Sequence, residues 1–301
     1  MFRRLLFSAV NIEVFCPGSL TNSPYRNVHL IRRHYTSKVT HGIQSHKVLV
    51  NGINLHYEKT GHGSHSILLL PGALGSSRTD FSPQLEGINR DQFTLFSFDP
   101  RGYGRSIPPE RDWPLEFIQR DAQDAAALMK ELGEQKYSVL GWSDGGITGM
   151  VLAARNPQVM KKLVIWGSNA YVTNKDMKIF KDIADISKWS ERMRAPFINV
   201  YGETYFQTQW IKWIEAYNAY LTQRKGDICI EDVPRIQCPT FLLHGKKDAM
   251  VLQEHPDYLV KHIKNVRYYE FPDGKHNIHL HYAKEFNALV EEFLLQPMAK
   301  L

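Results

Sequence analysis

The chain has few cysteines, no long apolar run and almost no acid in its first 35 residues. Cys16, Cys229 and Cys238 are too few and too widely spaced for a disulfide framework or a zinc site, and they suit a reducing compartment. No stretch approaches the ~18 consecutive apolar residues of a transmembrane helix, so we expect no membrane span. Apolar residues make up 43% and charged residues 23% of the 301 positions, which is typical of a soluble globular protein.

The scarcity of acid is confined to residues 1–35, where five arginines oppose one acid, Glu13, and give a net of +4. The whole chain carries +6, so about +2 remains for the other residues, and we expect no nucleic-acid partner. Such sequence is typical of a mitochondrial transit peptide, with Arg33 three residues before a processing point after Tyr35. We therefore predict a mitochondrial matrix protein. The alternatives are a secretory signal, which Asn11 and Glu13 interrupt, and a basic tail.

From residue 46 onward, short apolar runs alternate with segments of helical periodicity. A β-hairpin with a type I′ turn at Asn51 and Gly52 is predicted first. The further predicted strands are 66–70, 93–98, 137–140, 162–166, 240–244 and 266–271, and the predicted helices are 115–132, 147–154 and 283–295. Apolar strands of this kind are buried on both faces of a parallel sheet. The alternation thus predicts a doubly wound, mostly parallel α/β sheet.

Residues 169–236 interrupt this alternation. They have no strong strand signal and are rich in aromatic residues at helical spacing. We interpret them as a helical cap inserted into an α/β core made of residues 46–168 and 237–297. An aromatic stripe of this kind is more often core than ligand site, so we expect only a minority of the aromatics to face a substrate.

The functional hypothesis depends on a strand-turn-helix segment that contains Gly141, Ser143 and Gly145 in the pattern G-x-S-x-G of a nucleophile elbow. The turn is so tight that Ser143 has to adopt a strained backbone conformation, and side chains two residues away would collide. It presents the serine hydroxyl above the sheet with a helix N-terminus beneath it. A five-residue pattern also recurs by chance, so an incidental serine in a glycine-rich turn is the alternative.

A nucleophilic serine requires a histidine base and an orienting acid, which in this arrangement follow it in the order acid, histidine on loops after late strands. Asp248 follows the strand 240–244, and His276 follows the strand 266–271. We therefore predict a catalytic triad of Ser143, Asp248 and His276.

Other residues near the C-terminus compete for these roles. His279 and His281 are rival bases, but they lie at the start of the last predicted helix. Asp273 is a rival acid, although its position favours a turn. A metal site made of His276, His279 and His281 is disfavoured because no carboxylate cluster is nearby. We expect no metal and no cofactor.

Two backbone amides are expected to form the oxyanion hole, those of Asp144 and of Ala73 on the loop after the strand 66–70. The Asp144 carboxylate should then line the same cavity, where a negative charge is unfavourable unless the substrate brings a cation. A substrate with an α-ammonium group beside its ester carbonyl would bring one. Alternatively, Asp144 pairs with an arginine or caps the helix. Asp99 and Arg101 are expected to brace a loop.

Four motifs resemble those of serine hydrolases in the α/β-hydrolase family: Gly-Trp-Ser-Asp-Gly-Gly at 141–146, Asp-Pro-Arg-Gly-Tyr-Gly at 99–104, Val-Ile-Trp-Gly at 164–167 and Gly-Lys-His-Asn at 274–277. The resemblance covers residues 46–297. It implies the α/β-hydrolase fold and a mitochondrial enzyme that cleaves esters of α-amino acids, including amino acid ester prodrugs of nucleosides.

The same resemblance implies the triad given above and assigns the ammonium group of a small-molecule ester to Asp144. One departure concerns residues 71–75. The motif usually reads Pro-Gly-Met-Leu-Gly there, and this chain has Ala73 in place of the methionine. The backbone donor is kept, but the acyl pocket is expected to change. We further expect a monomer.

Two other functions remain open. A carbon–carbon bond hydrolase of ring-cleavage dienoates would share the fold and triad, although Asp144 would repel an acidic substrate. A non-catalytic binding module is disfavoured by the intact triad, and labelling with a fluorophosphonate would separate it from an enzyme.

Overall fold

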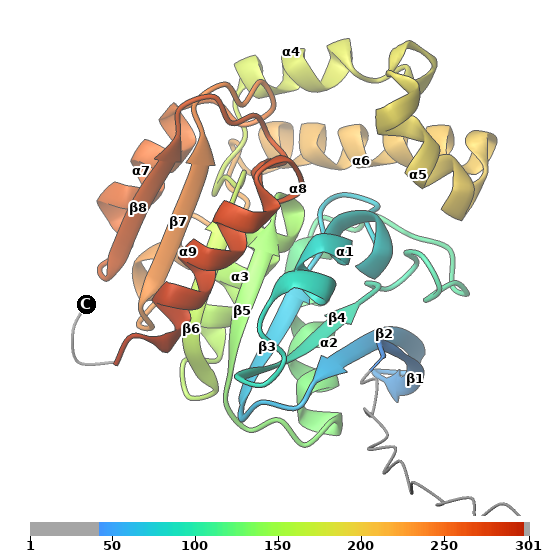
Figure 1. Ribbon diagram of the computed structural model, residues 1–301. Helices are drawn as coiled ribbons and strands as arrows, with labels where there is room; N and C mark the ends of the chain where they lie inside the picture. Colours follow the sequence, from blue (N-terminus) through green and yellow to red (C-terminus); the bar gives the residue numbers. More distant parts are fainter. Residues whose placement is uncertain (1–41, 298–301) are drawn as a thin grey trace, which may run out of the picture. The chain divides into compact units, whose positions relative to one another are not determined.

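The computed structural model of the protein describes residues 42–297, and the predicted transit peptide at residues 1–35 lies outside this range. Within it, eight strands form one sheet in the order β1-β2-β4-β3-β5-β6-β7-β8 (Figure 1). β1 pairs antiparallel with β2 and β2 with β4, whereas the remaining pairs are parallel. The strands are β1 (Gln44–Val50), β2 (Ile53–Gly61), β3 (His65–Leu70), β4 (Phe93–Phe98), β5 (Tyr137–Trp142), β6 (Met160–Trp166), β7 (Thr240–Gly245) and β8 (Val266–Phe271).

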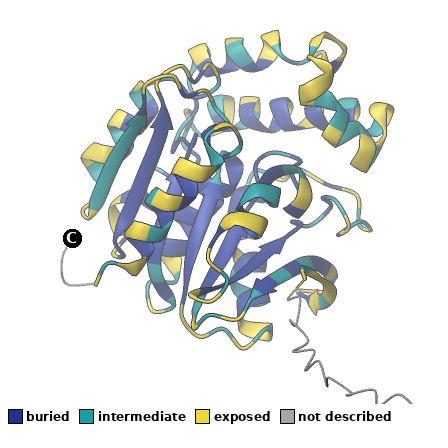
Figure 2. Cartoon of the chain, in the orientation of Figure 1, coloured by how far each residue is buried: buried dark blue, intermediate teal, exposed yellow. Residues whose placement is uncertain are grey.

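Helices cover both faces of this sheet. α1 (Ser77–Gly87) and α9 (Ala283–Leu295) pack on one face, and α2 (Phe117–Glu131), α3 (Asp144–Arg155) and α7 (Glu254–His262) pack on the other. Successive side chains of a strand point to opposite faces. Leu68 of β3 therefore packs in the core that contains α2 and α3, whereas Ile67 packs in the core that contains α1 and α9. Figure 2 shows the central strands as buried between these layers.

Local sequence signals explain several boundaries. Asn51 and Gly52 both have positive φ, 49° and 77°, as the predicted type I′ turn requires. α2 ends before Gly133, whose φ of 80° is left-handed. α1 and α7 were not among the predicted helices. α1 contains Pro83 and buries few apolar side chains, so its sequence lacks a regular apolar stripe.

The segment between β6 and β7 is helical. It contains α4 (Asn174–Asp182), α5 (Glu191–Tyr201) and α6 (Glu203–Gln223), with short 3₁₀ turns at Ile186–Lys188 and Val233–Arg235. In Figure 1 these helices lie beyond the carboxyl ends of the parallel strands. The predicted mostly parallel sheet with an inserted helical cap is thus confirmed. No helix in residues 42–297 is long and apolar enough to cross a membrane.

The two ends of the cap are joined in a short stem. The Val172 amide donates to the Gly226 carbonyl at 2.8 Å, and the Ile228 amide donates to the Ala170 carbonyl at 3.1 Å. A Cβ atom on Gly226 would lie 2.2 Å from the Val172 carbonyl oxygen, and the glycine φ is +87°. Only glycine allows the two chain segments to approach this closely.

Candidate active site

The segment after β5 has the backbone geometry of a nucleophile elbow. Ser143 has φ 54° and ψ −122°, a conformation that L-residues seldom adopt. A Cβ atom on Gly145 would lie 2.0 Å from the Leu70 carbonyl oxygen, and one on Gly141 would lie 2.4 Å from the Gly145 carbonyl oxygen. Both glycines are therefore required by the tight turn.

Neighbouring backbone holds this conformation in place. The Ser143 amide donates to the Trp166 carbonyl at the end of β6, at 3.0 Å. The Ser168 hydroxyl donates to the Ser143 carbonyl, also at 3.0 Å. These bonds tie the elbow to the neighbouring parallel strand, so the serine is held at the carboxyl edge of the sheet.

The structure brings His276 and Asp248 together. His276 Nδ1 and Asp248 Oδ2 are 2.9 Å apart, and the Asp248 carboxylate also accepts from the Met250 and Val251 amides. Burial opposes ionisation, but the contact with His276 and the Val251 amide lower the pKa of Asp248 below its usual value. A carboxylate held in this way can orient an imidazole ring.

The His276 ring lies beside the elbow. The Trp142 indole nitrogen donates to the His276 carbonyl at 3.0 Å, and a Cβ atom on Gly167 would lie 3.0 Å from His276 Cε1. Among residues 42–297 there is no hydrogen bond between the Ser143 hydroxyl and His276. In enzymes without substrate, catalytic hydrogen bonds are often long or poorly aligned, and they tighten in the substrate complex.

The loop that carries Ala73 lies against the nucleophile. A Cβ atom on Gly72 would be 3.4 Å from Ser143 Cβ. The Gly75 amide donates to the Gly72 carbonyl at 3.0 Å, which closes a turn with Ala73 and Leu74 at its centre. In the described part of the chain no acceptor is bonded to the Ala73 or Asp144 amide, so both are available as donors.

The Asp144 side chain is 6% exposed and contacts the cap. Its two oxygens accept from the Trp213 indole at 2.8 Å and the Tyr217 hydroxyl at 2.6 Å, both on α6. It therefore does not cap α3. Arg111 does not pair with it either, because that guanidinium makes two bonds to Asp121 at 2.8 and 2.7 Å. Burial raises the pKa of Asp144 to about 6, against the effect of Tyr217 and Trp213.

A family model described as "alpha/beta hydrolase fold" matches residues 65–200 and 172–281. The chain belongs to the α/β-hydrolase family. It is 51% identical to serine hydrolase BPHL of Homo sapiens over 252 residues, which cover 84% of this chain and 87% of that protein. The mouse protein of the same name is 50% identical with the same coverage. These relatives identify the chain as a serine hydrolase.

Solved structures show the same fold at lower sequence identity. An enol-lactonase from Burkholderia xenovorans LB400 has a TM-score of 0.67 and 22% identity, covering 83% of this chain and 100% of that one. A meta-cleavage product hydrolase from Pseudomonas fluorescens IP01 has a TM-score of 0.69 and 16% identity, covering 82% and 96%.

The alternative candidates for the base and the acid of this serine hydrolase lie outside the pair formed by His276 and Asp248. His279 is fully buried, accepts from the Trp166 indole at 2.9 Å and donates to the Asp80 carbonyl at 3.0 Å. Burial lowers the pKa of His279 to about 3, so the ring stays neutral. His281 is exposed, and Asp273 is an exposed partner of Lys247. Residues 42–297 contain no cluster of His, Cys, Asp or Glu suited to a metal ion.

Asp99 and Arg101 are held by bonds within the core. Asp99 accepts from the Ser77 and Arg105 amides and contacts His56, and Arg101 makes two bonds to Asp124. Both side chains therefore brace the loop after β4, as expected from the sequence.

The sequence alone did not reveal that Trp213 and Tyr217 are partners of Asp144. They are four positions apart on α6, so they lie on one helical face. That spacing was the available signal, but it does not reveal which core residue the face contacts.

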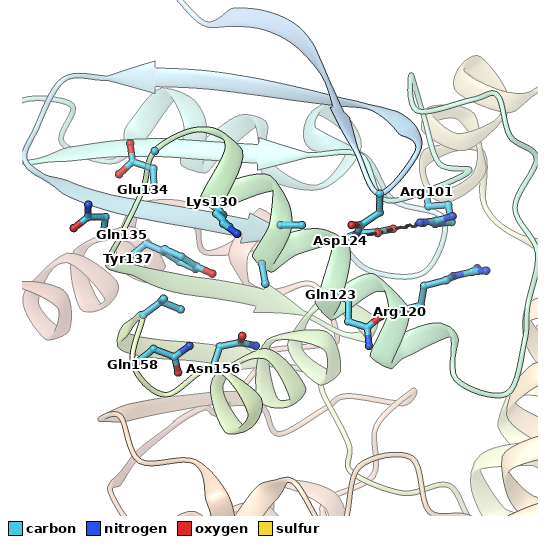
Figure 3. Close-up of a pocket in the computed structure, with 15 residues that line it drawn as sticks. Arg101, Arg120, Gln123, Asp124, Lys130, Glu134, Gln135, Tyr137, Asn156 and Gln158 are labelled. Atoms are coloured by element: carbon cyan, nitrogen blue, oxygen red, sulfur yellow. Dashed lines mark hydrogen bonds and ion pairs between the residues drawn. The ribbon is translucent and has the colours of Figure 1, made fainter.

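A large cavity lies elsewhere in the molecule (Figure 3). Its volume is about 900 Å³, and it is lined by residues of α2 and by Tyr137, among others. Tyr137 begins β5, whereas Ser143 follows the end of that strand. This cavity is therefore at the opposite edge of the sheet and is not part of the candidate site.

Proposed function

We propose that this serine hydrolase cleaves carboxylic esters of α-amino acids through Ser143, His276 and Asp248. The observation that carries the proposal is the environment of Asp144. A buried carboxylate directly after the nucleophile is held by two neutral donors, and none of the described cations forms an ion pair with it. Arg111 lowers the pKa of Asp144 through its charge, but it bonds to Asp121. A substrate ammonium group would supply a direct ionic partner.

In the proposed reaction His276 accepts the Ser143 proton as the hydroxyl oxygen attacks the ester carbonyl. The Ala73 and Asp144 amides would stabilise the resulting oxyanion. When the intermediate collapses, His276 returns the proton to the departing alcohol and an acyl-enzyme remains. Water then attacks the acyl carbonyl as it gives a proton to His276. When this second intermediate collapses, His276 returns that proton to the Ser143 oxygen and the free amino acid leaves.

Ionisation of Asp144 sets the pH range of the proposed recognition. Because the pKa of Asp144 is raised to about 6, the carboxylate is mostly charged at neutral pH and becomes neutral as the pH falls through that value. A bound ammonium group would favour the charged form further. Preference for charged esters should therefore be lost at acidic pH, and also above the pKa of the substrate amine.

A pair of esters of one alcohol, with and without the α-amino group, tests this assignment. In Asp144→Asn the amide oxygen can keep the Trp213 bond, while the Tyr217 hydroxyl turns to accept from the new NH₂ group. The variant thus removes charge with little change in shape. Loss of one partner of a buried pair costs about 3–5 kcal/mol, some of it recoverable if water enters. We expect kcat/KM for the amino ester to fall roughly 100- to 1000-fold and that for the neutral ester to change little.

An equal loss on both esters would show that Asp144 serves the structure and would overturn the substrate class. Hydrolysis of ring-cleavage dienoates in preference to amino acid esters would support the carbon–carbon bond hydrolase instead. Absence of fluorophosphonate labelling at Ser143 would support the non-catalytic binding module.

We also propose that residues 1–35 direct import into the mitochondrial matrix. The support is the arginine-rich, acid-poor composition of this segment. N-terminal sequencing of the protein from cells should find Thr36 or Ser37 first. An intact Met1, or the full-length chain in the cytosol, would contradict this proposal.

A further inference from the structure

We propose that Tyr201 of the cap is a positioning residue for the oxyanion hole. Its hydroxyl anchors a continuous series of hydrogen-bonded peptide groups that ends at the Ala73 amide. The proposal rests on the proposed function only in taking Ser143 as the nucleophile and Ala73 as an oxyanion donor. It does not depend on which ester is the substrate.

The first link joins the cap to the loop after β3. At the end of α5, the Tyr201 hydroxyl donates to the Leu74 carbonyl at 2.9 Å and accepts from the Gly104 amide at 2.8 Å. Burial raises the pKa of Tyr201 well above 10, so the hydroxyl remains a donor throughout the pH range of an esterase assay. The phenol thus holds one fixed peptide group on each side.

The next links pass through two peptide groups of the turn. The Leu74 carbonyl belongs to the same peptide group as the Gly75 amide, which donates to the Gly72 carbonyl at 3.0 Å. The Gly72 carbonyl in turn shares its peptide group with the Ala73 amide. Because the C=O and N–H of a trans peptide point in opposite directions, the Ala73 N–H points out of the turn.

All these bonds run in one direction. When the carbonyl of a peptide group accepts a hydrogen bond, the N–H of the same peptide group becomes a stronger donor. In such a series each hydrogen bond is strengthened by roughly 10–30%. The order is Gly104 amide, Tyr201 hydroxyl, Leu74–Gly75 peptide and Gly72–Ala73 peptide. The positive end of every group therefore points to the next member of the series, which ends at the Ala73 amide. These donors are already oriented before charge develops.

The turn itself needs such support. Leu74 has a φ of 54°, although this position of a type II turn normally takes glycine. A residue with a side chain keeps this conformation only where its surroundings enforce it. The Leu74 side chain is fully buried, and the Tyr201 hydroxyl fixes its carbonyl. Together they determine the direction of the Ala73 amide two residues after Pro71.

If Tyr201 had a purely structural role, its loss would give different experimental results. α5 buries none of its residues fully, so the Tyr201 bonds could serve only to dock this helix. In that case loss of the hydroxyl would lower the melting temperature or raise KM. It would not selectively weaken binding of an anionic tetrahedral adduct.

The test compares Tyr201→Phe with Tyr205→Phe. The Tyr205 ring stacks on that of Tyr201 at 5.9 Å, and its hydroxyl accepts a long bond of 3.4 Å from the Arg111 amide and also interacts with the Gln209 side chain. Neither partner belongs to the series that ends at the Ala73 amide. With a neutral ester we expect Tyr201→Phe to lower kcat roughly 5- to 20-fold, less than the 10²–10³ lost with a whole oxyanion donor. KM should stay within about twofold, since the bond acts through the developing charge. Affinity for an alkylboronic acid that adds to Ser143 should fall by the same factor as kcat, and Tyr205→Phe should match the wild type.

Amide hydrogen exchange in the wild type gives a second test that needs no variant to fold. Binding of the boronic acid should slow exchange at the Gly75 and Gly104 amides, which belong to the series but would not touch the adduct. The Gly102 amide, which donates to the Ser106 carbonyl at 3.3 Å, is the control and should not change.

The outcomes separate this proposal from the proposed function. Unchanged kcat in Tyr201→Phe, or equal slowing at Gly75, Gly104 and Gly102, would overturn the role of Tyr201 alone. A wild type that neither hydrolyses esters nor reacts with a fluorophosphonate at Ser143 would overturn both.

Discussion

The sheet edge and the cap contribute to the candidate site in different ways. At the sheet edge, backbone sterics fix the arrangement: glycine at 141 and 145 permits the strained Ser143, and paired strands hold it. The cap contributes side-chain donors instead, with Tyr201 on the oxyanion loop and Trp213 and Tyr217 on Asp144. Changes at the edge should therefore abolish the chemistry, whereas changes in the cap should adjust its rate and selectivity.

The largest expected effect is that of Ser143→Ala. Because it removes only the nucleophile oxygen, kcat should fall roughly 10⁴- to 10⁶-fold while the melting temperature stays near that of the wild type. Steady-state kinetics and differential scanning calorimetry measure the two quantities. Appreciable turnover in this variant would contradict the contrast between the sheet edge and the cap, since the sheet edge would then not supply the nucleophile.

His276→Ala should be similarly severe for kcat, and His279→Ala is its matched control. The second variant leaves the Trp166 indole and the Asp80 carbonyl without a buried partner. Urea unfolding should show a loss of about 2–5 kcal/mol for His279→Ala, with kcat changed only about threefold or less. If the kinetic loss fell on His279 instead, the assignment of the base would be wrong.

Asp248→Asn should lower kcat by about 10⁴-fold, because the amide no longer holds the imidazole in the correct tautomer. Asp273→Asn provides the control, since its exposed pair with Lys247 contributes little to stability or orientation. Comparable kinetics for the two variants would remove Asp248 from the proposed triad.

The smallest effect is expected in the cap, from Tyr217→Phe. Its hydroxyl lowers the pKa of Asp144, so its removal should raise that pKa further above its value of about 6. More Asp144 is then neutral at pH 6.5, and preference for charged over neutral esters should fall roughly 3- to 10-fold there. The ratio of kcat/KM for the two esters between pH 5 and 8 measures this shift. Tyr220→Phe, whose hydroxyl is not bonded to Asp144, should leave the ratio unchanged, and an equal shift in both variants would refute the role of Tyr217.

Sequence patterns predicted the sheet edge better than the cap for a physical reason. β4, β8 and α9 have the predicted ends because the strand and helix patterns that predict them are local signals. The Ser143 conformation follows from the elbow motif, and the roles of Ser143, Asp248, His276, Ala73 and Asp144 stay predictions. The donors to Asp144 are 69 and 73 positions away from it in the chain. Such contacts depend on how the cap packs, which no local pattern specifies.

The stem of the cap defines where the cap could be exchanged. Since the segments around Val172 and Gly226 bond to each other, the cap begins and ends at one place beside the sheet. A helical segment of another length could be joined at these two positions with the strand order kept. Exchange of the cap at the stem would therefore change selectivity without changing the sheet, and position 226 would have to stay glycine because the stem itself cannot form without it.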